Sequence, residues 1–317
     1  MSHQGKLQKR DEMLNVLDVL VTRYLNGKVR AVRLALVALL SGGHLLLEDI
    51  PGLGKTTLAL ALSRALGLSF GRVQCTSDLL PSDITGLSIF DREENRFRFI
   101  GGPIFNNIVL VDEINRSMPK TQSALLEAME ERRVTVEGVT YPLPEPFFVI
   151  ATQNPMEQVG TYPLPESQMD RFIIRTGIGY PPEEIEKSII THGSIRDDLR
   201  QIAPLVTIED ILEARRGIRE HVHLSVIVAD YIFALVAATR SHPLVLTGIS
   251  TRGGINIAET SRVYAYLEGR DFVAPEDVKA VAVPVGAHRL VCRGEQEGLD
   301  KEELLRTILG NIPVPLA

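Results

Sequence analysis

Residues 49–57, DIPGLGKTT, place two glycines, a lysine and two hydroxyl side chains where they could hold a polyphosphate. Glycines let backbone N–H groups turn toward phosphate oxygens, because no Cβ obstructs them. The lysine would bring its charge to the β- and γ-phosphates, and the first threonine hydroxyl would bind Mg²⁺. The segment therefore predicts a nucleotide-binding loop whose contact residues are Pro51, Gly52, Leu53, Gly54, Lys55, Thr56 and Thr57.

The loop departs from the pattern G-x-x-x-x-G-K-[ST] at its first position, where Asp49 replaces a glycine. A carboxylate that faced the phosphates would repel them. Aspartate also tolerates unusual backbone conformations and accepts hydrogen bonds from nearby backbone N–H groups. We expect Asp49 to brace the turn and to point away from the phosphates, so that a glycine there would change ATP binding little.

Two adjacent carboxylates, Asp112 and Glu113, end the apolar run NIVLV at residues 107–111. Charges at the end of a buried strand are costly unless they face a cation or water. Asp112 would hold Mg²⁺ through its water shell, and Glu113 would act as general base on the attacking water. Acidic residues also favour helix N-termini, but the loop upstream favours the catalytic interpretation.

A further apolar run, FFVIATQ at residues 147–153, is followed by the polar Asn154. Its amide could orient the water near the γ-phosphate. The pair Asn-Pro is also a common turn signal, so the run alone does not decide between the two roles.

These polar positions need strands and helices to bring them together. Short apolar runs at 44–50, 70–76, 106–112, 146–154 and 171–178 are separated by helical stretches, and two more helical stretches, 11–25 and 29–40, precede the first run. Such an alternation predicts a parallel five-stranded sheet covered by helices on both faces. The segments 86–105 and 132–144 show strand patterns around turn residues, and we predict a hairpin in each.

From residue 180 onward the strand patterns stop. Helical patterns follow at about 182–191, 208–219, 225–240, 252–267, 275–284 and 300–309. We therefore predict two domains, an α/β core at residues 1–179 and an all-helical domain at residues 180–317.

Composition excludes several classes of protein. The net charge of the 317 residues is −6 and no basic stripe is present, which argues against nucleic-acid binding. No run approaches the roughly 20 apolar residues of a membrane-spanning helix, and the polar start does not match a secretory signal. The two cysteines, Cys75 and Cys292, have no metal-ligand spacing. We expect a cytoplasmic protein without membrane insertion.

The loop, the segment CTSDLLPSDITG, the Asp-Glu pair and the segment ESQMDRF, in this order, resemble the AAA+ ATPases and more narrowly the MoxR family. The resemblance implies that Asn154 is the sensor 1 residue and that Arg171 is an arginine finger offered to a neighbouring subunit. It also implies that Arg252, in GISTRGG, is the sensor 2 arginine of a helical lid. Both arginines could instead be ordinary surface or helix-start residues. For Arg171, that alternative is an ion pair with Glu166 or Asp170.

The resemblance further implies the activity and the partners. It implies Mg²⁺-dependent hydrolysis of ATP to ADP by a homo-oligomer, a hexameric ring, with ATP between core and lid and with the lid moving against the core. The implied work is chaperone-like maturation of client proteins, by cofactor or metal insertion or by complex assembly. A von Willebrand factor A domain protein is one implied partner. The two predicted hairpins are either client contacts or ordinary surface hairpins.

Three other functions share the same loop. A nucleic-acid motor or loader of the related MCM type would need the basic surface that this chain lacks. A small-molecule kinase would not need Asn154 and the two arginines, and a non-catalytic nucleotide switch would not need intact Lys55, Asp112 and Glu113. The remodelling ATPase therefore accounts for the largest number of these residues.

Overall fold

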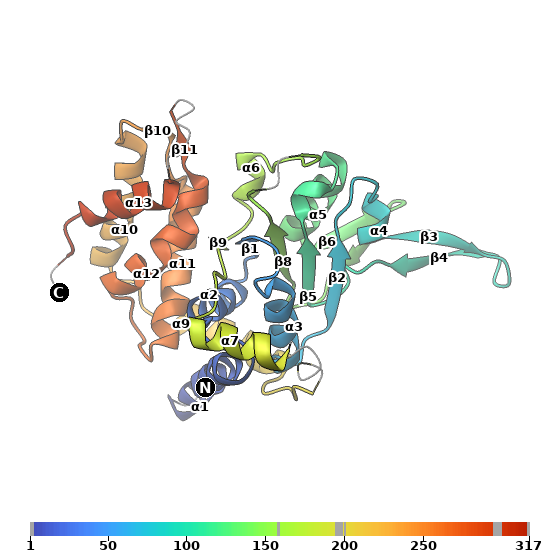
Figure 1. Ribbon diagram of the computed structural model, residues 1–317, viewed down its shortest axis with the longest axis horizontal. Coiled ribbons are helices and arrows are strands. Elements are labelled where there is room, and N and C mark those ends of the chain that lie inside the picture. The colour runs from blue at the N-terminus through green and yellow to red at the C-terminus, as the bar shows by residue number, and fades with distance from the viewer. Residues whose placement is uncertain (1–2, 157–158, 194–198, 200, 294–299, 316–317) are drawn as a thin grey trace.

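In the computed structural model of the chain, five parallel strands form a central sheet beside a group of helices (Figure 1). The structure describes residues 3–156, 159–193, 199, 201–293 and 300–315. The strands are β1 (Leu45–Glu48), β2 (Phe70–Gln74), β5 (Ile108–Asp112), β8 (Phe148–Gln153) and β9 (Ile174–Thr176). Their order across the sheet is β2-β5-β8-β1-β9, and every pair is parallel. The predicted parallel sheet is confirmed.

Helices cover both faces of this sheet because successive strand residues point to opposite sides. Leu45 and Leu47 of β1 join one apolar cluster, and Leu46 joins the other. The first cluster includes residues of α1 (His3–Val19), η1 (Leu20–Tyr24), α2 (Val29–Leu40) and α3 (Lys55–Ala65). The second cluster includes residues of α4 (Pro81–Thr85), η2 (Ile114–Arg116) and α5 (Pro119–Glu131). A short helix, α6 (Glu166–Met169), precedes β9.

The C-terminal part is helical, as predicted. Its helices are α7 (Glu183–His192), α9 (Ile208–His221), α10 (Val226–Ser241), α11 (Thr251–Leu267), α12 (Pro275–Gly286), η3 (Ala287–Arg289) and α13 (Lys301–Gly310). One addition was not predicted. The short strands β10 (Val245–Thr247) and β11 (Val291–Cys292) form an antiparallel pair among these helices.

The two parts share a hydrophobic core. Buried residues of α9 to α13 belong to the same cluster as those of α1, α2 and one face of the sheet. The N-terminal helix α1 contacts α9 and α11, and α2 contacts the same two helices. The lid is therefore packed on its own sheet through the N-terminal helices.

Both predicted hairpins are present. Strands β3 (Gly86–Asp91) and β4 (Arg96–Gly101) pair in one, and β6 (Arg133–Val136) and β7 (Val139–Pro142) pair in the other. The β3–β4 hairpin projects away from the sheet, on the side opposite the lid (Figure 1). The Phe99 ring stacks on Tyr141 at a centroid distance of 4.0 Å, which attaches the first hairpin to the second.

Candidate active site

The predicted nucleotide-binding loop joins the end of β1 to the start of α3. Gly52 and Gly54 have φ values of +90° and +94°, which non-glycine residues rarely adopt. Apart from Gly52 and its two chain neighbours, no heavy atom of the described residues lies within 4 Å of the place where a Cβ of Gly52 would stand, so the space beside the loop is open. The loop leads directly into the N-terminus of α3, where backbone N–H groups and the helix dipole favour an anion. These features fit a bound polyphosphate.

Lys55 is the first residue of α3, and its Nζ donates a hydrogen bond of 2.5 Å to the backbone oxygen of Asp49. Partial burial lowers the pKa of Lys55, while the charges of Asp49, Asp112 and Glu113 act in the opposite direction. The ammonium group therefore lies close enough to these three carboxylates for their charges to act on it.

The Asp49 carboxylate faces away from the open side of the loop. Its Oδ2 accepts hydrogen bonds from the backbone N–H groups of Ile178 and Gly179, the latter at 3.0 Å. These residues follow β9, so Asp49 connects the loop to the chain that leads into α7. The partners are remote in sequence and not within the loop, which is why sequence alone suggested a local brace.

Asp112, at the end of β5, is buried and its carboxylate is held from two sides. Arg72 of β2 makes a two-pronged contact with Asp112 Oδ2, with Nε at 2.9 Å and Nη2 at 2.8 Å. The hydroxyl of Thr152, on β8, donates to Oδ1 at 3.3 Å. The adjacent strands β2 and β8 therefore fix the orientation of this carboxylate.

Glu113 follows directly and adopts a left-handed backbone conformation with φ of +57°. Its N–H donates to the Thr152 hydroxyl at 2.9 Å, and its Oε2 accepts from Gln74 Nε2 at 3.1 Å. An ion pair of 3.4 Å joins the same oxygen to Arg116. A strained turn that aims a carboxylate is a feature of functional sites.

Asn154 follows β8, which lies between β5 and β1 in the sheet. Its Oδ1 accepts a hydrogen bond of 3.2 Å from the N–H of Met156, so the amide also supports the local turn. Because all these strands are parallel, Lys55, Asp112, Glu113 and Asn154 are brought to the same edge of the sheet.

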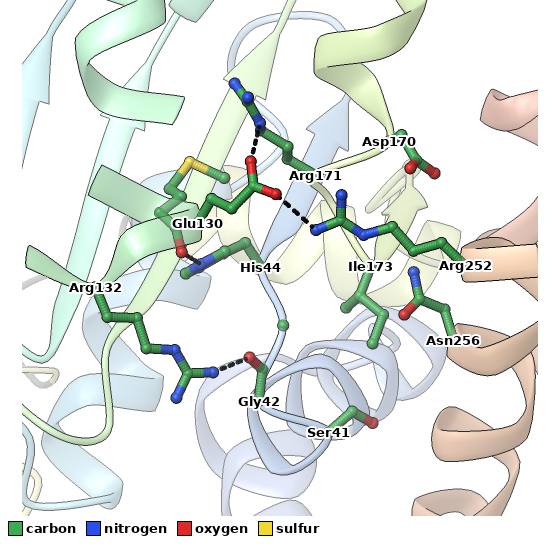
Figure 2. Close-up of a pocket in the computed structure, with 12 residues that line it drawn as sticks. Ser41, Gly42, His44, Glu130, Arg132, Asp170, Arg171, Ile173, Arg252 and Asn256 are labelled. Atoms are coloured by element: carbon green, nitrogen blue, oxygen red, sulfur yellow. Dashed lines mark hydrogen bonds and ion pairs between the residues drawn. The ribbon is translucent and has the colours of Figure 1, made fainter. Parts of the chain in front are cut away.

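The two predicted arginines lie elsewhere. Arg171 and Arg252 border a pocket of about 190 Å³ that also includes residues 41–44, directly before β1 (Figure 2). β1 has four residues and is roughly 13 Å long, and the loop with Lys55 follows its other end. Within one copy, the lid therefore packs with its Arg252 next to Arg171 and not at the end of β1 from which the loop departs.

Each arginine makes an ion pair with Glu130 of α5. Arg171 Nε lies 2.9 Å from Oε2, and Arg252 Nη2 lies 3.2 Å from Oε1 (Figure 2). The observed partner of Arg171 is therefore Glu130 and neither Glu166 nor Asp170. Arg252 is the second residue of α11, which starts after the N-cap Ser250.

A lid arginine holds the segment that carries Arg171. Arg289 is buried, and its guanidinium donates to the Asp170 carboxylate at 2.6 Å and to the backbone oxygen of Phe172 at 2.9 Å. Burial lowers the pKa of Arg289, and the Asp170 charge opposes that shift. The position of Arg171 in the core thus depends on the lid.

Sequence reasoning did not single out Arg72, Gln74, Thr152 or Glu130. Arg72 and Gln74 alternate with buried residues on β2, which is a weak signal for side chains at a sheet surface. Their partners became apparent only with the pairing of β2 and β5.

In the described part of the chain, no helix is long and apolar enough to cross a membrane. The same residues contain no group of three or more His, Cys, Asp or Glu side chains that could hold a metal ion. Magnesium bound chiefly by phosphate oxygens and water needs only one or two protein ligands, so the lack of such a group does not bear on the predicted ligands Thr56 and Asp112.

Known proteins resemble this chain over most of its length. The model of the ATPase family associated with various cellular activities matches residues 44–174, and the AAA lid domain model matches residues 237–308. A crystal structure of a protein assigned as an ATPase from Cytophaga hutchinsonii has a TM-score of 0.91 and 38% identity, covering 99% of this chain and 98% of that one.

Three relatives extend over nearly the whole chain. The uncharacterized protein YeaC of Bacillus subtilis is 44% identical over 298 residues, 93% of each chain. Chaperone MoxR1 of Mycobacterium tuberculosis is 38% identical over 307 residues, 93% of this chain and 80% of the relative. Protein MoxR of Paracoccus denitrificans is 33% identical over 321 residues, 92% of this chain and 93% of the relative. This chain belongs to the MoxR family of AAA+ ATPases.

Proposed function

We propose that this protein hydrolyses ATP in a Mg²⁺-dependent reaction, at sites formed between neighbouring copies in a ring, and uses the reaction to remodel client proteins. One observation carries the proposal. The loop with Lys55 and the arginines Arg171 and Arg252 lie beyond opposite ends of β1. A single copy therefore holds two halves of different sites, and a second copy is needed to complete either one.

Within one site, each side chain has a separate task. Lys55 leaves the Asp49 carbonyl to contact the β- and γ-phosphates, and Thr56 and Asp112 hold Mg²⁺. The metal, when bound, neutralises charge on the phosphate oxygens. Glu113 accepts a proton from the attacking water, and Asn154 orients that water. Arg171 and Arg252 of the neighbour stabilise charge on the transferred phosphoryl group.

Mixing two inactive variants tests the shared site. Lys55→Ala removes the charge of the loop but keeps both arginines. Arg171→Ala removes one arginine but keeps the loop with Lys55. Each variant alone should lose ATP turnover, by about 10³-fold for Arg171→Ala. Mixed rings should regain part of it, because some loops then meet an intact neighbour. The Lys55→Ala/Arg171→Ala double variant is the matched control, since it cannot complete the Arg171→Ala site. Absence of recovery in the first mixture at every ratio would falsify the shared site.

The client-remodelling part of the proposal rests on the family and on the exposed hairpins. The family includes the chaperone MoxR1 of Mycobacterium tuberculosis, and the β3–β4 hairpin exposes Phe90 and Phe97 by 50% and 68%. Exposed apolar side chains on a projecting hairpin suit contact with a partner protein. We place this work in the cytoplasm, with a homo-hexamer and a von Willebrand factor A domain partner as the specific expectations.

A trap variant tests for clients. Glu113→Gln should bind ATP normally and hydrolyse it 10²–10⁴-fold more slowly, by about the contribution of a general base. Clients should then be retained on the ATP-bound ring and recovered by affinity purification from cells. The Lys55→Ala variant, which should not bind ATP, is the control. If both variants retain the same proteins, the client hypothesis is wrong while the ATPase site is untouched.

A further inference from the structure

Glu130 joins two cationic side chains from different parts of the molecule. It is the penultimate residue of α5 and its side chain is 37% exposed. One carboxylate oxygen contacts Arg171 of the core, and the other contacts Arg252 of the lid, at 2.9 and 3.2 Å. Figure 2 shows the two guanidinium groups on either side of this carboxylate.

The contact leaves the arginines able to bind a ligand. Arg171 meets Glu130 through Nε, and among the described residues no other hydrogen bond or ion pair engages its two terminal nitrogens. A guanidinium held at Nε presents its terminal N–H groups as a fork, the geometry that suits phosphate oxygens. Arg252 uses only Nη2 on Glu130. The carboxylate thus orients both groups without occupying all their donors.

The charges of the three side chains also favour a carboxylate between the two guanidinium groups. Two guanidinium groups brought together repel each other, and a carboxylate between them offsets that repulsion. Desolvation would raise the pKa of Glu130, but the charges of Arg171 and Arg252 outweigh it, so the pKa lies below its usual value. Glu130 therefore stays ionised at neutral pH.

The neighbouring Glu131 shows how an ordinary surface ion pair differs from the contacts of Glu130. Glu131 contacts Arg133 at 2.9 Å, both side chains are at least half exposed, and neither borders the pocket. Glu130, by contrast, lies beside Met129, whose backbone oxygen contacts the buried His44. The end of α5 is therefore fixed by the core at the point where Glu130 projects.

We infer that Glu130 is a positioning residue that sets Arg171 and Arg252 as one two-arginine unit for the terminal phosphate in a neighbouring subunit. The inference rests on the shared site proposed above and adds the residue that makes its arginine half a single unit. Glu130 also connects the lid to the core directly, because its carboxylate contacts Arg252 of the lid and Arg171 of the core.

The test is Glu130→Gln in the full-length protein, with Glu131→Gln as matched control. Glutamine keeps the shape but loses the charge, so the two arginines should separate. We expect kcat to fall on the order of tenfold to a hundredfold, with unchanged ATP affinity and thermal stability. Glu130→Asp, which keeps the charge, should recover part of kcat, and Glu131→Gln should match the wild type.

Mixed rings distinguish a role in the neighbour's site from a role in the protein's own site. Adding Lys55→Ala subunits, whose arginines and Glu130 are intact, should raise the turnover of Glu130→Gln. If turnover does not rise, or if Glu130→Gln alone is faster than wild type, the inference is wrong. If Glu130→Gln has normal kcat while Arg171→Ala is inactive, the role of Glu130 is also wrong, but the shared site remains supported. Normal turnover by Arg171→Ala would overturn both the shared site and the role of Glu130.

Discussion

At the scale of single residues, His44 is a buried histidine whose protonation state is set by its contacts. Its Nδ1 accepts a hydrogen bond from the Val149 N–H at 3.0 Å, so Nε2 carries the proton and contacts the Met129 oxygen at 3.1 Å. Burial, with help from Arg132 and Arg215, lowers its pKa to about 4 against the weaker opposing effect of Met129. His44 is therefore neutral in the folded protein at pH 7.

A pH dependence of stability follows. The unfolded chain binds a proton at this position below about pH 6.5, whereas the folded chain does so only near pH 4. Stability that is present above pH 6.5 should therefore be lost as the pH falls toward 4, by roughly 3 kcal/mol from His44. Denaturant unfolding at several pH values measures it. His288 is also buried with a lowered pKa, so it should destabilise the protein in the same direction as the pH falls. Comparing the wild type with His44→Gln therefore isolates the contribution of His44. Parallel curves for the two proteins would contradict the assignment.

Asp49 gives a second prediction at this scale. Asp49→Ala should lower the free energy of unfolding by about 1–3 kcal/mol, because the N–H groups of Ile178 and Gly179 lose their acceptor. Asp49→Asn keeps an acceptor oxygen and should lose less. ATP affinity, measured by titration, should change little in both. A tenfold tighter Kd for Asp49→Ala would show that the carboxylate faces the phosphates after all.

At the scale of elements, the aromatic contacts of Phe99 attach the β3–β4 hairpin to its neighbours. Phe99 stacks on Tyr141 and also meets Phe105 at 5.5 Å, whereas Phe97 contacts Phe90 within the hairpin. Phe99→Ala should therefore loosen the hairpin, by about 0.5–1.5 kcal/mol for the lost aromatic pair. Hydrogen exchange of the β3 and β4 amides should accelerate severalfold. Phe97→Ala is the control, and equal acceleration in both variants would contradict this account.

The comparison of sequence and structure is clearest for the elements. The boundaries of α2 agree with the prediction, and β5 and β8 lie within the runs that predicted them, because a long apolar pattern fixes each element locally. β10 and β11 have three and two residues and carry no such pattern. Lys55, Asp112 and Asn154 could be recognised from local motifs. The partners Arg72 and Glu130 could not, because each depends on which elements are neighbours.

At the scale of the whole molecule, lid and sheet are joined by one apolar cluster. Moving the lid far from its own sheet would expose part of that cluster to water, which favours motion between subunits over motion within one.

Met13→Ala tests the joint core. Met13 of α1 is fully buried in the shared cluster, so the variant should be about 2–5 kcal/mol less stable. Hydrogen-exchange protection should fall together in α9 of the lid and in β1 of the sheet. Loss of protection confined to the lid would indicate two independent cores.

Because β1 separates the two proposed half-sites, the molecule has two chemically different ends. In the ring proposed above, each copy has one end that receives arginines and another that donates them, so copies join head to tail and only ring closure satisfies every end. A defect at the donating end silences the next copy along and leaves its own loop intact. In a cell that makes both the wild-type protein and a variant defective at Arg171 or Glu130, the variant would therefore also disable sites on wild-type copies. The fraction of sites lost would exceed the sites that the variant copies themselves carry.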